Sequence, residues 1–406
     1  MKVLFLTHRL PYSPNRGDRQ RAFHILRTLA PEAEVELVSL VHDRLEENEV
    51  PKLRQALGIR VTALKVPRLR NHLSALVALG GSRPLTHVLL NAPGVVPALE
   101  SIVKERPPDV VLAYCSSMAQ FAVQSPLAGY PLVIDMVDLD SGKWAALAQE
   151  AAPPMRWIYN REARQLANFE RQAIAHAQTT LVVNDREADA VRAVAPEARV
   201  QVLPVGVDVE ALEPRTAPAD EPRIVFCGVM NYTPNVNGVL WFAREVWPLV
   251  RQVCPTATFS IVGSEPTGPI RRLASESEGI EVTGPVPDVA PYLWRAGVSI
   301  APLHIARGVQ NKVLEAVSAG LPTVVTASVL EGLPNEVRVA CRLADTAGDF
   351  ARQTTRLLRM TGLERRAMAG RANCRVLSWD RQMAPLRDIL QDAALATTSR
   401  PASSVA

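Results

Sequence analysis

Lys312 and Glu315 are three residues apart at the start of an expected helix over residues 312–319. Residues at this spacing are neighbours on one face of a helix. The preceding loop, residues 308–311, can present backbone N–H groups to an anion, and the helix dipole favours negative charge at that end. Lys312 adds a full positive charge, whereas Glu315 would repel a phosphate and suits a neutral diol such as a ribose. The pattern predicts a nucleotide-phosphate site, and a solvated Lys312–Glu315 pair is the alternative.

Lysine is rare in this chain, which favours a functional role for Lys312. Six of the 45 basic residues are lysines, and Lys312 is the only one after residue 143. A compact ammonium on a long stem suits one phosphate oxygen in a confined site, where arginine is not an equivalent substitute. We therefore expect Lys312 to contact a phosphate.

The elements that must position this site follow an alternating pattern in both halves of the chain, which is typical of parallel sheets covered by helices. Strands are expected at 3–7, 35–40, 61–66, 110–113, 131–137 and 180–183, then at 224–227, 258–262, 280–283, 298–302 and 323–326. Helices are expected at 20–29, 155–177, 235–250, 270–275, 289–296, 312–319, 346–360, 363–377 and 379–393.

A proline-rich stretch without periodicity, residues 206–222, is expected to link two domains, 1–205 and 223–375. Residues 376–395 contain a last amphipathic helix, and the polar tail 396–406 is expected to be disordered. In open parallel sheets ligands bind beyond the carboxyl ends of the strands, and domain interfaces favour pockets. We therefore expect a cleft between the two domains.

Composition excludes several function classes. A chain of 406 residues with 48% hydrophobic and 21% charged residues is typical of a soluble protein with two domains. The net charge of +4 permits anionic substrates or an acidic membrane surface but is too small for a nucleic-acid partner. Five scattered cysteines lack metal-ligand or redox spacing. Dinucleotide, Walker A, zinc-protease and nucleophile-elbow signatures are absent from the sequence.

The expected location is the cytoplasm, because the first six residues read as a strand and not as a signal peptide. No window reaches the roughly 18 apolar residues that span a bilayer. Residues 65–79 interleave basic with apolar side chains. This stretch predicts either a helix on an anionic membrane surface, with peripheral attachment to the inner membrane, or an ordinary surface helix over the first sheet.

Several segments together resemble the retaining GT-B glycosyltransferases of family 4. Residues 308–325 resemble the nucleotide-sugar motif of that family, and residues 226–242 resemble the start of its second domain. The nucleotide-binding loops are matched by 262–263 and 282–288, and the opening of the family by 11–17. Residues 135–144 and the form of 310–315 are similar, more narrowly, to the sugar transferases associated with bacterial exopolysaccharide clusters of the PEP-CTERM/exosortase systems. The resemblance covers residues 1–395.

The resemblance implies an α/β protein of the GT-B fold, with two Rossmann-like βαβ domains facing a cleft and a C-terminal helix crossing back to the first domain. The first domain would bind the acceptor and the second the nucleotide-sugar. The implied activity is metal-independent, cofactor-free hexosyl transfer with retention. The implied substrates are a nucleotide diphosphate-sugar donor and a lipid-linked exopolysaccharide intermediate as acceptor.

The resemblance also assigns roles to residues. Lys312 and the loop amides would stabilise the leaving diphosphate, Glu315 would hold the ribose, and Val286 would pack on the base. Asp138, Lys312 and Glu315 are the expected catalytic residues. The expected donor-binding residues are Gly17, Gly228, Asn231, Gly263, Val286, Arg307, Gly308, Val309, Gln310, Asn311, Lys312 and Glu315.

Two positions depart from the family pattern. Arg307 stands where members commonly carry a glutamate; an arginine can bind a phosphate but cannot replace a carboxylate on sugar hydroxyls. Asp138, with Asp135 nearby, stands where a histidine is common. Asp138 and Asp140 also match the Asp-x-Asp metal motif of the other large glycosyltransferase fold, but this match is weak, and a helix cap or a solvated loop carboxylate is the favoured explanation. A non-catalytic GT-B partner of another transferase, or a GT-B epimerase, is the alternative function.

Overall fold

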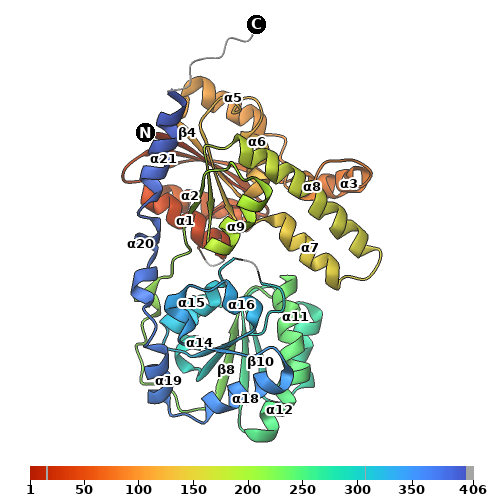
Figure 1. Cartoon of the computed structure of the whole chain (residues 1–406), viewed down its shortest axis with the longest axis vertical. Helices are drawn as coiled ribbons and strands as arrows, with labels where there is room; N and C mark the ends of the chain where they lie inside the picture. Colours follow the sequence, from red (N-terminus) through yellow and green to blue (C-terminus); the bar gives the residue numbers. More distant parts are fainter. Residues whose placement is uncertain (15–16, 307, 399–406) are drawn as a thin grey trace. The chain divides into compact units, whose positions relative to one another are not determined.

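The computed structural model describes residues 1–14, 17–306 and 308–398. The chain divides into two compact units, each built on its own parallel sheet (Figure 1). The first unit comprises Met1–Pro204 together with Gln382–Ala406, and the second comprises Val205–Arg381. The stretch predicted as a linker, residues 206–222, belongs to the second unit.

In the first unit the described strands form a seven-stranded parallel sheet in the order β3-β2-β1-β4-β5-β6-β7. Strands such as β4 are buried along their whole length, because helices cover both faces of the sheet. The strands are β1 Lys2–Thr7, β2 Glu34–Val41, β3 Arg60–Lys65, β4 Val110–Tyr114, β5 Leu132–Val137, β6 Thr179–Val182 and β7 Val200–Val202. The six strands predicted for this half are confirmed, and the short β7 was not predicted.

The helices of the first unit are α1 Gly17–Leu29, α2 Arg44–Leu57, α3 Arg68–Ala78, α4 Leu85–Leu89, α5 Val95–Glu105, α6 Cys115–Ala122, α7 Asp140–Glu150, α8 Met155–His176 and α9 Asp185–Val194. The predicted helices near α1, α3 and α8 are confirmed. The sequence did not predict α2, which contains Pro51, a residue unfavourable inside a helix. Asp43 caps the start of α2 and Gly58 ends it with a φ of 64°, so the ends of this helix are well defined.

The described strands of the second unit form a six-stranded parallel sheet in the order β10-β9-β8-β11-β12-β13. They are β8 Arg223–Cys227, β9 Thr258–Val262, β10 Ile280–Gly284, β11 Val298–Ala301, β12 Thr323–Val325 and β13 Cys341–Leu343. The helical elements are α11 Thr233–Trp241, η1 Phe242–Val246, α12 Trp247–Val253, α13 Gly268–Glu276, α14 Ala290–Arg295, α15 Asn311–Ser318, α16 Ala327–Glu331, α17 Asn335–Arg338, α18 Ala347–Leu358, α19 Gly362–Ala369 and η2 Cys374–Leu377. A single-turn helix, α10 Val209–Leu212, precedes β8.

The predicted helix 235–250 is confirmed, although it contains the π-helical turn η1 between α11 and α12. Two other long predicted helices are wrong in their continuity. The predicted helix 363–377 ends with α19 and continues after a break as the 3₁₀ turn η2. The last predicted helix divides into α20 Trp379–Met383 and α21 Leu386–Thr398 on either side of Pro385, since proline cannot donate the backbone hydrogen bond that a helix needs.

The C-terminal helix returns to the first unit, as predicted for the fold. On that unit, α21 packs against β4 and β5, and Arg387 forms an ion pair with Glu32 at 2.9 Å. Within the second unit, a Cβ atom on Gly206 would lie 2.5 Å from the Cα of Trp379. The return of the chain therefore begins at a close contact that only glycine permits.

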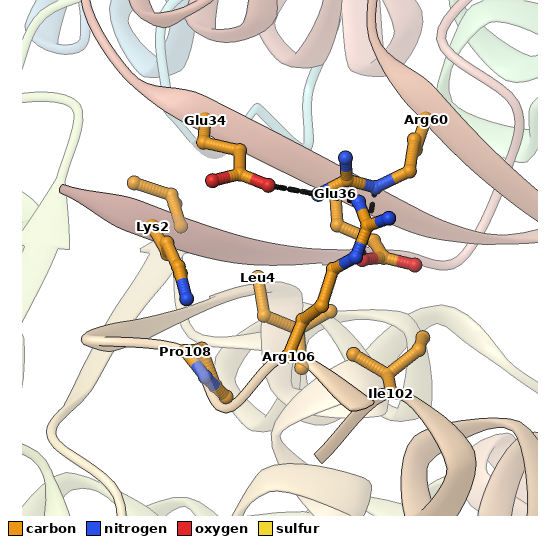
Figure 2. Close-up of a pocket in the computed structure, with 9 residues that line it drawn as sticks. Lys2, Leu4, Glu34, Glu36, Arg60, Ile102, Arg106 and Pro108 are labelled. Atoms are coloured by element: carbon orange, nitrogen blue, oxygen red, sulfur yellow. Dashed lines mark hydrogen bonds and ion pairs between the residues drawn. The ribbon is translucent and has the colours of Figure 1, made fainter. Parts of the chain in front are cut away.

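An ion-pair cluster closes the amino ends of β1, β2 and β3 (Figure 2). Arg60 contacts Glu34 at 2.6 Å and Glu36 at 3.4 Å, and Arg106 contacts Glu34 at 3.7 Å. The partners are largely exposed, so each pair contributes little to stability. The candidate catalytic and binding residues lie at the opposite edge of the sheet, at the carboxyl ends of the strands.

Candidate active site

Lys312 lies in the first turn of α15, which follows β11 and its loop in the second unit. The loop reaches the helix through Gly308, whose φ of 59° is in the left-handed region. Gln310, the N-cap residue of α15, makes no side-chain capping hydrogen bond, and the helix dipole favours negative charge at this end. At the other end Gly320, with a φ of 81°, closes the helix through a hydrogen bond from the Leu321 amide to the Ala316 carbonyl. The helix predicted over 312–319 is confirmed.

The ammonium of Lys312 is held by neutral partners. It donates to Oδ1 of Asn235 at 2.9 Å and to Oε1 of Gln310 at 3.5 Å, and it lies 5.1 Å from the ring centroid of Phe226. These contacts fix the position of the charge without neutralising it. Burial lowers the pKa of Lys312 to about 8, while the carboxylate of Glu315 acts in the opposite direction. A bound anion would be a favourable partner for this ammonium.

Two predicted glycines allow close packing beside Asn235. Gly228 and Gly263 follow β8 and β9, and a Cβ atom on Gly263 would lie 1.7 Å from the Gly228 carbonyl oxygen. A Cβ atom on Gly228 would lie 2.8 Å from Nδ2 of Asn235, which itself donates to the Val229 carbonyl at 2.9 Å. The glycines thus allow the loops after β8 and β9 to pack closely against each other. This packing fixes the position of the Asn235 side-chain amide, which accepts the hydrogen bond from Lys312.

The remaining predicted donor-binding residues lie at the carboxyl ends of neighbouring strands. Asn231 donates to Glu265 between the loops after β8 and β9. Val286 is half-buried in the loop after β10, and Val309 packs against the core before α15. Gly17, the predicted phosphate-approach glycine, begins α1 in the first unit. Arg307 lies outside the described residues.

Asn235 and Phe226 were missing from the predicted site. Asn235 is buried in the first turn of the helix after β8, directly beyond the strand end, and its amide bonds both Lys312 and the preceding loop. A buried asparagine at such a position is the signal that could have identified it. The structure thus brings together Gly228, Asn235, Gly263 and Lys312 as one constellation.

Asp138 follows a strained strand end in the first unit. Val137, the last residue of β5, has a φ of 65°, and the pairing of β5 with β6 shifts register between Asp135 and Val137. Positive φ is unfavourable for a β-branched residue and recurs at functional sites. All three non-glycine residues with positive φ in the described part of the chain lie at or just after the carboxyl end of a strand: Cys115, Val137 and Glu265.

Asp135 has a structural role. Its carboxylate accepts from Nε of Arg21 at 2.8 Å and from a terminal guanidinium nitrogen at 3.1 Å, and both side chains are buried. Arg21 also donates to the Pro204 carbonyl at 3.1 Å. The pair fixes β5 against α1, leaving half-buried Asp138 as the carboxylate at the strand end.

A carboxylate cluster surrounds the start of α7. Asp140 accepts from the Ser116 hydroxyl at 2.8 Å, and the amide and hydroxyl of Ser141 both donate to buried Glu170. Burial raises the pKa of Glu170 to about 7, and the nearby charges of Asp140 and Asp138 add to the effect. Within the described residues, no three His, Cys, Asp or Glu side chains are grouped so as to hold a metal ion.

The raised pKa of Glu170 predicts a pH-dependent stability. Between pH 4.5 and about 7 the folded chain binds a proton that the unfolded chain has lost, so this group's stabilising contribution decreases as pH rises. Replacing Glu170 with Gln should remove a decrease of about 3 kcal/mol across this interval. Urea denaturation of both proteins at pH 5 and pH 8 measures the difference, with the exposed Glu150→Gln as control. Parallel pH profiles for the wild type and Glu170→Gln would contradict the assignment.

Each half of the chain matches the model of a known protein family. Residues 16–206 match the model of a glycosyl transferase 4-like domain, and residues 221–360 match the model of glycosyl transferases group 1. None of the curated proteins compared with the chain matches it.

Solved structures share the fold over almost the whole chain. The sucrose-phosphate synthase of Thermosynechococcus elongatus is 16% identical with a TM-score of 0.74, covering 98% of this chain and 100% of its own. WaaG, a glycosyltransferase involved in lipopolysaccharide biosynthesis, is 17% identical with a TM-score of 0.62 and the same coverages. Anabaena Alr3699/HepE in complex with UDP-glucose is 15% identical with a TM-score of 0.62, again with these coverages. These similarities confirm the predicted GT-B fold; the narrower similarity to PEP-CTERM/exosortase transferases stays a prediction.

Proposed function

Because the chain consists of two glycosyltransferase domains of the GT-B type, we propose that it transfers a sugar, with retention, from a nucleotide diphosphate-sugar to a lipid-linked exopolysaccharide intermediate. The observation that carries this proposal is the placement of Lys312. The ammonium of half-buried Lys312, with neutral hydrogen-bond partners, stands at the start of α15, where a diphosphate would add a negative partner to it.

The donor end of the reaction belongs to the second unit in this proposal. Lys312 and the amides of residues 308–311 stabilise the diphosphate as the bond from the sugar carbon to its phosphate oxygen breaks and the electron pair leaves with the diphosphate. Glu315, one turn further along α15, holds the ribose hydroxyls, and Val286 packs on the base. These fixed charges and dipoles serve the leaving group without a metal ion or cofactor. Loss of activity on adding a chelator would contradict that part of the proposal.

Asp138 is the catalytic group of the first unit in this proposal. Support comes from its place directly after the strained Val137, at the carboxyl end of β5. The acceptor hydroxyl forms the new bond to the sugar carbon as the bond to the diphosphate breaks, and the hydroxyl proton passes to the leaving diphosphate oxygen. The carboxylate of Asp138 stabilises the positive charge that develops on the sugar in this transition state.

Thermal-shift measurements with a panel of nucleotide-sugars test the proposal directly. The Anabaena relative was solved with UDP and with UDP-glucose, so UDP-sugars are the first candidates, beside GDP-, ADP- and dTDP-sugars. The matched donor should raise the melting temperature by about 5 °C at a concentration of about 100 times its dissociation constant, because stabilisation grows with the logarithm of ligand concentration. A panel with no stabilising member would contradict the proposal.

Peripheral attachment to the cytoplasmic face of the inner membrane is part of the proposed function. Among the described residues, no helix combines the length and the apolar character needed to cross a bilayer. On α3, however, four apolar side chains are 60% to 86% exposed: Leu69, Leu73, Leu76 and Val77. The exposed Arg68 and Arg70 lie on the same helix. This combination supports binding to the headgroup boundary of an anionic membrane.

Substitution of two α3 leucines tests the membrane surface. The double variant Leu73→Glu/Leu76→Glu should lower co-sedimentation with anionic vesicles at low salt by at least about tenfold, since each leucine loses its apolar burial. Leu45→Glu is the matched control, because Leu45 is 77% exposed on α2. Equal binding of the wild type and the double variant, or no binding of the wild type, would exclude α3 as the membrane contact.

A further inference from the structure

The helices α7 and α8 form an open groove that none of the assignments above uses. They run side by side as a hairpin in the first unit (Figure 1). The groove has a volume of about 660 Å³, and its lining includes Ala145 from α7 and Trp157, Ala163 and Ala167 from α8. Small alanine side chains leave room between the two helices, and Trp157 is 56% exposed beside them. The groove is shaped for an apolar chain.

Two polar side chains in the groove have no hydrogen-bond or ion-pair partner within the described part of the chain. They are Arg164 and Asn160, both exposed on α8. An unpaired guanidinium beside an apolar surface complements a phosphate carried on a hydrocarbon. None of the described residues that line the groove carries a carboxylate. The charge of the groove therefore favours an anionic amphiphile over a neutral one.

The groove and the exposed face of α3 belong to one rigid piece of the first unit. Arg161 of α8 donates to the carbonyls of Ala78 and Gly81, each at 2.6 Å, at the end of α3. Glu162 accepts from the Leu85 and Thr86 amides at 2.7 and 2.8 Å and so caps α4. Both residues are buried, so α8 holds α3 firmly. If α3 rests on a membrane, the groove is held in a fixed relation to that membrane.

We propose that the α7–α8 groove binds the lipid phosphate of the acceptor, with the phosphate against Arg164 and the hydrocarbon along Ala145, Ala163 and Trp157. The proposal rests on the lipid-linked acceptor of the proposed function and assigns it a site. The lining residues of α8, from Trp157 to Ala167, extend over about 15 Å, which accommodates a chain of decyl length. The base of the groove, at Ser141, lies three residues from Asp138 along the chain. A lipid phosphate held there would bring its glycan near the predicted catalytic carboxylate.

Calorimetric titration of the full-length protein with n-decyl phosphate, below its critical micelle concentration, tests this proposal. Decyl phosphate should bind about tenfold more tightly than either decanol or inorganic phosphate, because each lacks one half of the interaction. Ala145→Trp, which fills the groove from an exposed position, should abolish binding. Arg164→Ala should weaken decyl phosphate to the affinity of decanol. Arg171→Ala, an exposed arginine of α8 outside the groove lining, is the matched control.

The possible outcomes separate the groove from the donor site. Unchanged binding in Ala145→Trp, equal binding of inorganic phosphate and decyl phosphate, or no binding by the wild type would overturn the groove proposal. Thermal stabilisation by the matched nucleotide should be the same in the wild type, Ala145→Trp and Arg164→Ala, which shows that the variants are folded. Decyl phosphate binding without nucleotide stabilisation would instead contradict the proposed donor function and leave the groove intact.

Discussion

Lys312→Ala should reduce the rate of sugar transfer by about 10²- to 10³-fold. This is the usual effect of removing one preorganised group that stabilises the negative charge developing in a transition state. The variant removes the ammonium that Asn235 and Gln310 hold beside α15. It should also abolish the slow hydrolysis of the donor by water, which needs the diphosphate site but no acceptor. Steady-state kinetics with saturating acceptor, together with a donor-hydrolysis assay, measure both effects.

The charge state of Lys312 gives this prediction a second readout. Its pKa of about 8 means that the free site loses its positive charge as pH rises through this value. Nucleotide affinity should therefore fall above about pH 8 in the wild type. Lys312→Arg should bind with a flatter pH profile, because arginine stays protonated, but should transfer slowly, because the guanidinium does not reproduce the geometry of the ammonium.

Lys52→Ala is the matched control for the loss of a lysine, since Lys52 is exposed and, within the described residues, forms an ion pair only with its helical neighbour Glu49. It should leave transfer unchanged. Wild-type hydrolysis that Lys312→Ala abolishes would also separate the enzyme from a non-catalytic GT-B partner. A Lys312→Ala protein that is folded and fully active would remove the main support for the donor site.

Asp138→Asn should lower turnover by about 10²-fold while changing donor affinity by less than about twofold. The amide keeps the size of the carboxylate but not its charge, and the predicted donor-binding residues other than Gly17 belong to the other unit. The expected pattern is a loss in kcat with little change in the donor dissociation constant. Transfer rates and donor titration, measured on the same preparation, give the two numbers.

Asp135→Asn is the informative comparison for Asp138. Asp135 is fully buried against Arg21, and breaking a buried ion pair on one side typically costs about 3–5 kcal/mol of stability. Asp135→Asn should therefore lower the unfolding midpoint strongly, whereas Asp138→Asn should lower turnover and leave the midpoint close to that of the wild type. Unchanged turnover in Asp138→Asn would exclude its catalytic role.

The sheets were largely predictable because most strands are short apolar runs buried on both faces, whereas the unpredicted β7 and β13 are short and only partly buried. A run of this kind can be predicted from its own residues, without knowledge of its neighbours in the sheet, as β1 and β8 illustrate. Helix α15 was predictable for a similar reason, since its apolar face, its left-handed Gly320 and the following Pro322 are all local signals. The helical segments that were missed or wrongly joined depend on tertiary packing or on prolines, as α2 and the division between α20 and α21 show.

The candidate site was only partly predictable for the same physical reason. Lys312 could be identified from local spacing and residue type, and Gly228 and Gly263 from the resemblance to the glycosyltransferase family. The hydrogen bond from Lys312 to Asn235 joins residues 77 positions apart, and the Arg21–Asp135 pair joins residues 114 positions apart. Contacts at such separations arise from the order of strands in the sheets and leave no local pattern. The strain at Val137 is likewise visible only in the folded backbone.

In the proposed function, the loop and first turn of α15 bind the diphosphate of the donor. This binding can be measured by calorimetric titration of the wild-type and Lys312→Ala proteins at pH 7, with the nucleoside diphosphate of the preferred base and with the matching nucleoside. The variant should lose about 10²-fold in affinity for the diphosphate, and both proteins should bind the nucleoside with the same weak affinity. Equal affinity of both proteins for the diphosphate, or an equal loss for the nucleoside, would contradict it.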